Sequence, residues 1–159
     1  MTTKNSDLVA NFEASHQVFN DAALLGGELR VAQGTIELVA GDSTDNDIVM
    51  LAPVPSHATL PQIFIGTDTF GGSCTFNVGL YLADGTVKDE DVFATSVADA
   101  AGMADVRFEA ANIDTAGKKV FELAGDTTDP GGYYYVAVTF NATGGTAGTM
   151  SFLIHYVVN

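Results

Sequence analysis

Short segments in which apolar and polar residues alternate recur along most of this sequence and constrain its fold more than any other feature. The clearest is TFNVGLYLA at 75–83, where four apolar residues share one face: Phe76, Val78, Leu80 and Leu82. Successive side chains of a strand point to opposite faces, so this spacing predicts a strand with one buried side. A sheet with one apolar face needs a second layer to cover it, which favours a layered β fold.

Eight segments either alternate in this way or are short β-rich apolar runs bounded by turn residues. They lie at 27–32, 35–40, 47–52, 59–65, 75–83, 104–109, 132–140 and 149–158. Gly34 is expected to form a hairpin between the first two, with these residues inward: Leu29, Val31, Ile36 and Leu38. The Gly- and Thr-rich linker from Asn141 to Gly148 is expected to be a second hairpin loop.

Two local features refine this assignment. Pro61 removes a ladder donor and therefore predicts an edge strand or a bulge at 59–65. In 104–109, Val106 and Phe108 alternate with charged residues, which places Arg107 on the wet face of its strand.

Two segments have helical spacing instead. From 89 to 100, apolar residues recur at helical intervals behind three acids that suit a helix N-terminus. From 112 to 124 a similar spacing ends at Gly125, which is placed as a C-cap. Together, the elements predict a two-sheet antiparallel β-sandwich, jelly-roll-like, of about eight strands with one or two short helices in its connections.

The first 26 residues differ from the rest and are assigned to an N-terminal arm, with one sandwich domain over 27–159. Apolar residues outside any alternating pattern make this arm the candidate partner-binding segment: Leu8, Phe12, Val18, Phe19 and Leu25. Such a segment buries itself poorly, so it is expected to dock on its own domain or on a neighbouring subunit. The alternative is that the arm forms one more edge strand of its own sandwich.

The charge balance excludes several classes of partner. The chain has 6 Lys and Arg against 20 Asp and Glu, a net charge of -14, and its basic residues form no stripe. Such a surface repels nucleic-acid phosphates and anionic lipid headgroups, so neither nucleic acid nor membrane is expected as a partner. A single cysteine, Cys74, cannot form an internal disulfide and is interpreted as a small buried hydrophobe.

The acidic loop GDSTDND at 41–47 is the one candidate metal site, because Asp42, Asp45 and Asp47 could offer oxygen ligands to calcium. It lacks the glycine at the sixth position and the closing glutamate of an EF-hand loop. A solvated turn is therefore the favoured interpretation, and no metal or other cofactor is expected.

No catalytic constellation is recognisable in this sequence. His16, His57 and His155 lie in unrelated contexts, and neither a G-x-S-x-G elbow nor a phosphate-binding glycine motif occurs. The chain is therefore expected not to be an enzyme. Tyr133 and Tyr135 share one strand face and could stack on sugar rings, which is the basis of an alternative function.

Three stretches resemble small virion proteins of tailed bacteriophages, especially capsid decoration, or cement, proteins of marine phages. They are DIVMLAPVPSHATL at 47–60, NVGLYLADGTVKDEDVFATS at 77–96 and DPGGYYYVAVTF at 129–140. The resemblance covers most of the chain after residue 20, and the stretches are scaffold-like segments without catalytic signatures.

The resemblance implies a β-sandwich that binds the major capsid protein on the outside of the phage head and stabilises the shell, often as a homotrimer. It implies a virion location, with synthesis in the cytoplasm of the bacterial host. The alternative is a receptor- or glycan-binding β-sandwich module of a virion or cell surface. Catalytic residues and cofactors are expected in neither case.

Overall fold

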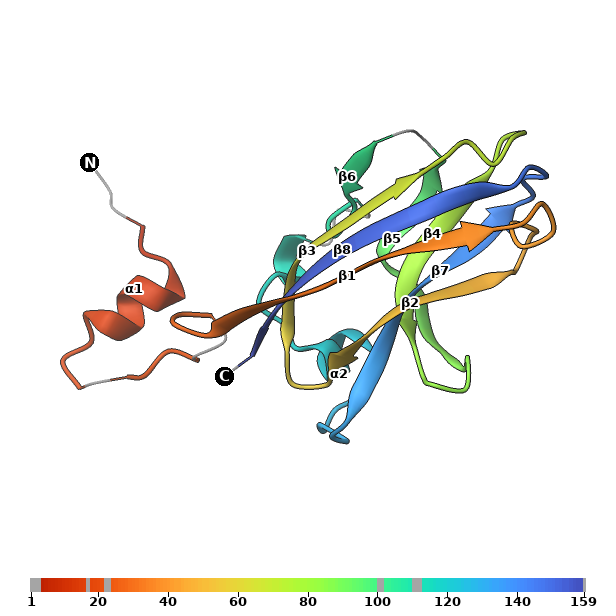
Figure 1. The fold of residues 1–159 in the computed structure, drawn as a ribbon. Helices are drawn as coiled ribbons and strands as arrows, with labels where there is room; N and C mark the ends of the chain where they lie inside the picture. Colours follow the sequence, from red (N-terminus) through yellow and green to blue (C-terminus); the bar gives the residue numbers. More distant parts are fainter. Residues whose placement is uncertain (1–3, 17, 22–23, 100–101, 110–112, 159) are drawn as a thin grey trace.

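The computed structural model describes residues 4–16, 18–21, 24–99, 102–109 and 113–158 (Figure 1). A short helix comes first, α1 (Asp7–Phe12). The strands are β1 (Glu28–Leu38), β2 (Ile48–Pro55), β3 (Thr59–Thr67), β4 (Thr75–Tyr81), β5 (Val87–Ala98), β6 (Met103–Asp105), β7 (Tyr133–Ala142) and β8 (Gly148–Val158). A 3-10 turn (Ile113–Thr115) and α2 (Val120–Leu123) lie between β6 and β7.

The strands form two four-stranded antiparallel sheets in the orders β1-β8-β3-β6 and β2-β7-β4-β5. Sequential strands mostly alternate between the sheets, and the first strand pairs with the last along eleven positions, from Glu28 opposite Val158 to Leu38 opposite Gly148. This is the jelly-roll arrangement. The two-sheet all-β sandwich expected from the sequence is confirmed.

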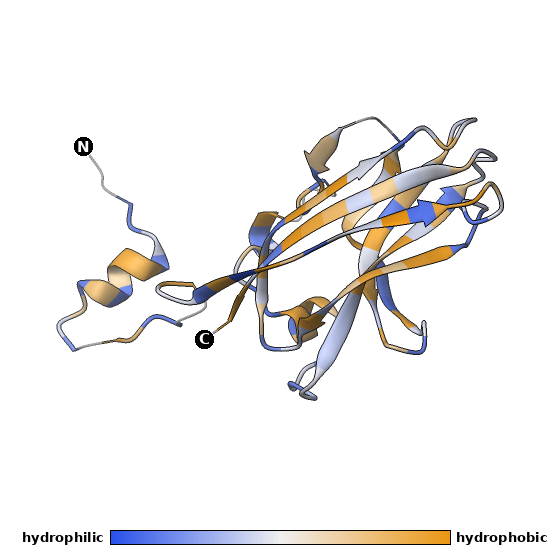
Figure 2. Ribbon diagram, viewed as in Figure 1, coloured by the Kyte–Doolittle hydropathy of each residue, from blue (hydrophilic) through white to orange (hydrophobic). Residues whose placement is uncertain are grey.

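The core lies between the two sheets and is built from alternate residues of each strand. Its largest buried apolar side chains include Phe70, Phe76, Phe93, Phe140, Leu60, Ile63, Met150 and Ile154. Figure 2 shows hydrophobic residues distributed along both sheets, and it shows that α1, beyond the end of the sandwich, is hydrophobic over much of its length as well.

The hairpin expected at Gly34 is wrong, because Glu28–Leu38 is one continuous strand. Along a continuous strand, even-numbered and odd-numbered residues lie on opposite faces. Ile36 and Leu38 therefore point inward as expected, whereas Leu29 and Val31 point outward and are exposed. Gly34 serves another purpose: a methyl group on it would lie 2.8 Å from the ring of Phe152 on β8. The glycine thus makes room for a core aromatic ring.

The helix expected over 89–100 is also wrong. These residues belong to β5, up to Ala98, and residue 100 lies outside the described residues. The β4–β5 ladder changes register three times, and Ser96 adopts a positive φ of 53°. Bulges of this kind destroy the two-residue period on which strand prediction rests.

The elements from β6 to the start of β7 are shorter than expected. The strand expected over 104–109 is limited to β6, which ends at Asp105, and the chain then turns. The helix expected over 112–124 is a 3-10 turn followed by α2; Asn112 lies outside the described residues. Gly125 follows α2 with a positive φ of 81°, consistent with its expected capping role.

The loop from Asn141 to Gly148 is not a hairpin, since β7 and β8 lie in different sheets. It crosses from one layer to the other at one end of the sandwich. At Pro61 the bulge alternative is correct, because the β3–β8 register shifts between Thr59 and Gln62 while β3 lies inside its sheet.

Candidate functional site

The N-terminal arm forms a small hook around α1. Asn11 Nδ2 donates to Asn20 Oδ1 over 2.8 Å, and Asn20 Nδ2 donates to the Leu8 carbonyl over 3.1 Å. These bonds fold the chain after the helix back against it. Every residue of α1 remains at least partly exposed, so the hook adds no buried side chain to the core.

The hook brings most of the predicted arm residues around one hollow. Phe12, Val18, Phe19 and Leu25 line a cavity of about 510 Å³, together with polar residues that include Asn11 and Asn20. Phe12 is 83% exposed and Phe19 is 81% exposed. Leu8 is half-buried and is not among the lining residues. Four of the five candidates therefore form one exposed apolar surface, which we call the arm surface.

The base of the arm contacts the sandwich near α2. Lys119 Nζ lies 3.2 Å from Asp21 Oδ2. A methyl group at Gly117 would lie 3.2 Å from Leu24 Cδ2, so this leucine lies close against the glycine. The described residues of the arm form no edge strand: residues 7–12 are helical, and the described strands begin with β1 at Glu28.

The acidic loop is organised by its own turns. Asp42 accepts a bond from the Val39 amide over 2.9 Å, and Asp47 accepts bonds from the amide and hydroxyl of Thr44, which lower the pKa of Asp47. Asp45 accepts a bond from Asn46 over 3.0 Å. Among the described residues, no group of three or more histidine, cysteine, aspartate or glutamate side chains is placed to hold a metal ion. The three aspartates therefore do not converge on one point.

The side chains with catalytic potential lie apart. Cys74 is buried, and burial raises the pKa of its thiol. His57 is exposed in the β2–β3 loop, whereas His155 lies on the outer face of β8, with its ring edge-on to Phe64 at 6.0 Å between centroids. Within the described ranges, these groups are not assembled into a nucleophile and base.

The tyrosines of the alternative function lie on the outer face of the second sheet. Tyr133 is 62% exposed and Tyr135 is half-buried. They pair across the ladder with Pro55 and Pro53, respectively. Tyr134 points to the core, as the alternation predicted, so two tyrosines and two prolines make up this apolar surface.

The sequence did not reveal the role of Arg107, which was expected on a wet face. Its side chain is fully buried: Nε donates to the Leu60 carbonyl over 2.8 Å, and its terminal nitrogens donate to Thr115. The guanidinium carbon lies 4.9 Å from the ring centre of Phe93 and 4.5 Å from that of Phe108. Burial lowers the pKa of Arg107 to about 10. The residue fastens the 3-10 turn to β3.

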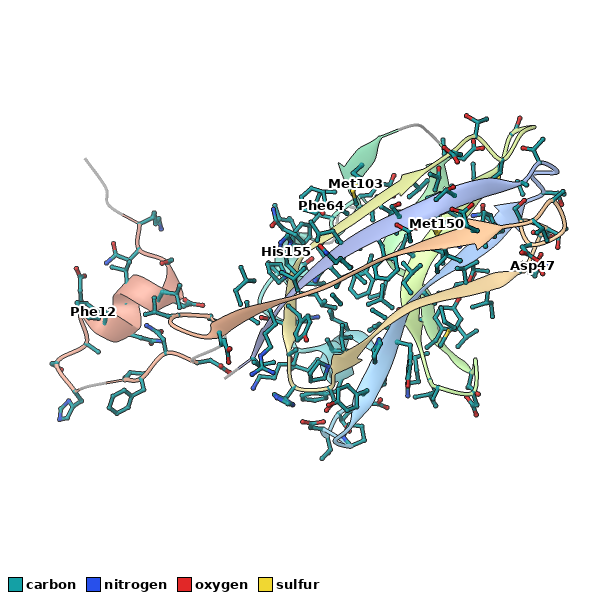
Figure 3. All side chains as sticks on the ribbon, viewed as in Figure 1. Phe12, Asp47, Phe64, Met103, Met150 and His155 are labelled. Atoms are coloured by element: carbon teal, nitrogen blue, oxygen red, sulfur yellow. The ribbon has the colours of Figure 1, made fainter. Side chains whose placement is uncertain are left out.

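A second feature was missed: the apolar outer side of the sheet β1-β8-β3-β6. Leu29 is 59% exposed and Val31 is 49% exposed, beside partly exposed residues of two neighbouring strands: Phe64, Leu153 and Val157. One signal in the sequence could have revealed it: β8 has apolar residues at both even-numbered and odd-numbered positions, whereas a strand with one solvent-exposed face is expected to be apolar at alternate positions only. Figure 3 places Phe64 and His155 at this surface and Asp47 at the end of the sandwich far from Phe12.

The geometry defines the chain as a jelly-roll β-sandwich with a protruding N-terminal hook. A chain from the cyanophage Pam1 capsid asymmetric unit shares this fold with a TM-score of 0.55 and 16% identity, over 100% of both chains. A chain from the capsid of Ralstonia phage GP4 has a TM-score of 0.55 and 18% identity, over 94% of each chain. The expected resemblance to phage virion proteins is thus confirmed at the level of the fold.

No family model matches the chain, and no curated protein matches it in sequence. Among the described residues, no helix is long and apolar enough to cross a membrane.

Proposed function

We propose that this chain is a structural protein of a bacteriophage virion: a capsid decoration protein that binds the outside of the head and stabilises it. The observation that carries the proposal is the jelly-roll fold, shared over its full length with a chain of a phage capsid. The function is binding without catalysis, the partner is the major capsid protein, and the chain acts as a homotrimer on the virion surface. Neither nucleic acid nor membrane is a partner.

The arm is the proposed binding element. Its surface residues Phe12, Val18, Phe19 and Leu25 are exposed around one hollow. Burying a large apolar side chain contributes about 1.5–3 kcal/mol, so four such residues can supply substantial binding free energy. The rest of the surface is acidic, and it keeps the unbound protein soluble in saline water.

Binding to empty shells of the major capsid protein from the same phage tests this function. We expect saturable attachment by the full chain in a co-sedimentation assay. A chain lacking residues 1–20 should fold and fail to attach. A folded deletion that still attaches would refute the anchor role of the arm, and its failure to fold would assign the arm to the sandwich.

A glycan-binding module is the second candidate, favoured by the exposed Tyr133 beside Tyr135 and two prolines. A glycan array separates the two functions. Sugar binding that is abolished by Tyr133→Ala and Tyr135→Ala would favour the glycan module. Absence of sugar binding together with saturable shell binding would favour decoration.

A further inference from the structure

The helix α1 is too short to hold its shape by itself. It has six residues, from Asp7 to Phe12, whereas isolated helices shorter than about 12–15 residues are marginal in water. Within the described residues, the side chain of its N-cap residue Ser6 forms no capping bond, and no residue of the helix is buried. The shape of the hook must therefore come from contacts with the chain that follows the helix.

Asn20 makes the contacts that hold this helix. Its side-chain amide is used at both ends: Oδ1 accepts a bond from Asn11 Nδ2 over 2.8 Å, and Nδ2 donates to the Leu8 carbonyl over 3.1 Å. Leu8 and Asn11 are three residues apart and are therefore neighbours on the surface of α1. Asn20 thus spans this turn of the helix and closes the hook against it.

The burial pattern of the hook is the reverse of that in an ordinary amphipathic segment. Among the described residues from 4 to 21, Leu8, Asn11 and Asn20 are half-buried and the others are exposed. Phe12 and Phe19 are among the exposed ones, although phenylalanine is usually buried and asparagine usually exposed. A segment that folded only for its own stability would bury the rings. This one shields the two asparagines and presents the rings to a partner.

The two bonded asparagines lie next to the two exposed rings. Asn11 directly precedes Phe12, and Asn20 directly follows Phe19. The bond between the asparagines therefore holds the backbone at one ring close to the backbone at the other, and both rings line the same hollow. Without this bond, the rings would be connected only through the chain from 13 to 18.

The residue after Asn20 fixes the hook to the sandwich. Asp21 Oδ2 lies 3.2 Å from Lys119 Nζ, and the Asp21 carbonyl accepts bonds from the amides of Leu24 and Leu25 over 2.9 and 3.0 Å. Adjacent residues thus bond in two directions, Asn20 to α1 and Asp21 to the domain. This arrangement sets the direction in which the hook projects beyond the end of the sandwich (Figure 1).

We propose that Asn20 is the positioning residue of the arm: it holds Phe12 and Phe19 in their binding arrangement before the partner is met. The inference rests on the proposed function, in which the arm surface binds the shell, and it assigns the residue that prepares this surface. Ordering a flexible segment upon binding costs free energy, and a segment that is ordered beforehand avoids that cost. Asn20 therefore raises affinity without contacting the partner.

Shell binding and local structure, measured on the same full-length variants, test this role. Asn20→Ala removes both bonds to α1, and Asn11→Ala removes one of them. In the co-sedimentation assay, Asn20→Ala should weaken attachment about tenfold, as expected when the net contribution of two hydrogen bonds is lost, and Asn11→Ala should weaken it less.

Nuclear magnetic resonance of the unbound chain supplies the structural measurement. The Cα chemical shifts of residues 7–12 should be helical in the unsubstituted chain and should move toward random-coil values in Asn20→Ala. The melting temperature should stay the same, because the hook adds no buried side chain to the core. A change in melting temperature would place Asn20 in the stability of the sandwich and contradict a role confined to the arm.

Asn5→Ala is the matched control. The Asn5 side chain donates to Glu13 over 3.2 Å in the same arm, but both residues are exposed. Water competes for such a bond, so its loss should leave the attachment and the chemical shifts unchanged. Equal losses of attachment in Asn5→Ala and Asn20→Ala would contradict a specific role of Asn20.

Two further results would overturn the proposal. Undiminished attachment by Asn20→Ala is the first. The second is weakened attachment with unchanged helical shifts, because Asn20 would then contact the shell itself. Failure of the proposed function gives a different result: an unsubstituted chain that attaches to no shell would contradict decoration and this role together, whereas the two results above contradict the role of Asn20 alone.

Discussion

Gly79 of β4 lies directly against the backbone of Asp89 on β5: a methyl group on this glycine would stand 2.1 Å from the Asp89 carbonyl oxygen. The neighbouring strand therefore presses on the outer side of β4 where a side chain would normally be. The β4–β5 register shifts at this point, between Val78 and Leu80, and again on either side of it, between Phe76 and Val78 and between Leu80 and Tyr81. Gly79 is what allows β5 to bulge over the sheet.

Gly79→Ala should strongly destabilise the fold. A methyl group cannot be accommodated by a side-chain rotation, because the atoms it meets belong to the backbone of β5. We expect a loss of at least about 3 kcal/mol in the free energy of unfolding, at the upper end of overpacking costs, measured by urea denaturation.

Gly41→Ala is the matched control. A methyl group at Gly41 meets nothing within 4 Å, so the free energy of unfolding should change by less than about 0.5 kcal/mol. A stable Gly79→Ala variant would mean that β5 does not lie against β4 as described.

Arg107→Lys should destabilise the protein although it keeps the positive charge. A lysine cannot reproduce the fork that bonds the Leu60 carbonyl and Thr115 together. The expected cost is about 2 kcal/mol, the range for hydrogen bonds to a charged group, measured by denaturant titration. Arg30→Lys, at an exposed ion pair with Glu28, should leave the free energy of unfolding nearly unchanged. Equal effects at both sites would contradict the clamping role of Arg107.

Asp126 should contribute to the loss of stability in acid. Hydrogen bonds from Lys88 and from the Tyr134 hydroxyl hold the pKa of Asp126 below its usual value. Its stabilising contribution is therefore present above the ordinary carboxyl pKa of about 3.9 and is lost as the pH falls through the lower folded-state pKa.

Asp126→Asn removes this dependence, so its melting temperature should fall less steeply below about pH 4 than that of the unsubstituted chain. Asp45→Asn is the comparison, because the exposed Asp45 carboxylate accepts its bond from the adjacent residue Asn46, whereas Asp126 joins segments that are distant in the sequence. Parallel acid profiles for the Asp126→Asn variant and the unsubstituted chain would show that the Lys88–Asp126–Tyr134 contact does not stabilise the fold.

Chelation of calcium should leave the melting temperature unchanged, and Asp45→Ala should not alter that result. The carboxylates of Asp42 and Asp47 already accept bonds from their own turns, and no metal-binding group of three is found among the described residues. Differential scanning calorimetry with and without chelator makes the measurement. A chelator-induced decrease that Asp45→Ala abolishes would restore the calcium hypothesis for this loop.

The sequence was informative where a strand kept a strict two-residue period, as in β4 and β7, and misleading where bulges broke it. In β5, the positive φ of Ser96 and the register shifts opposite Gly79 spread apolar residues at intervals that resemble a helix. In β1, Gly34 had the local character of a turn, and only the ring of Phe152, more than a hundred residues away, explains it. Local patterns do not contain such contacts.

The candidate arm residues could be found because they stood outside every alternating segment, and the structure groups four of them around one hollow. Their function remains a prediction. The exposed apolar residues on the outer side of the sheet β1-β8-β3-β6 could not be found in this way, because Leu29 and Val31 were interpreted as core residues of a hairpin strand. Arg107 was equally hidden, since its position among Leu60, Thr115 and two phenylalanine rings exists only in the folded chain.

The position of β8 has a consequence for the order of events during synthesis. β8 lies between β1 and β3, so these two strands, which are made much earlier, have no neighbour at their shared position until β8 has been made. Until then the apolar inner sides of β1 and β3 are not sealed, and unpaired strand edges invite aggregation. We therefore expect this sheet to close only after synthesis of β8, so nascent chains that lack β8 would depend on chaperones.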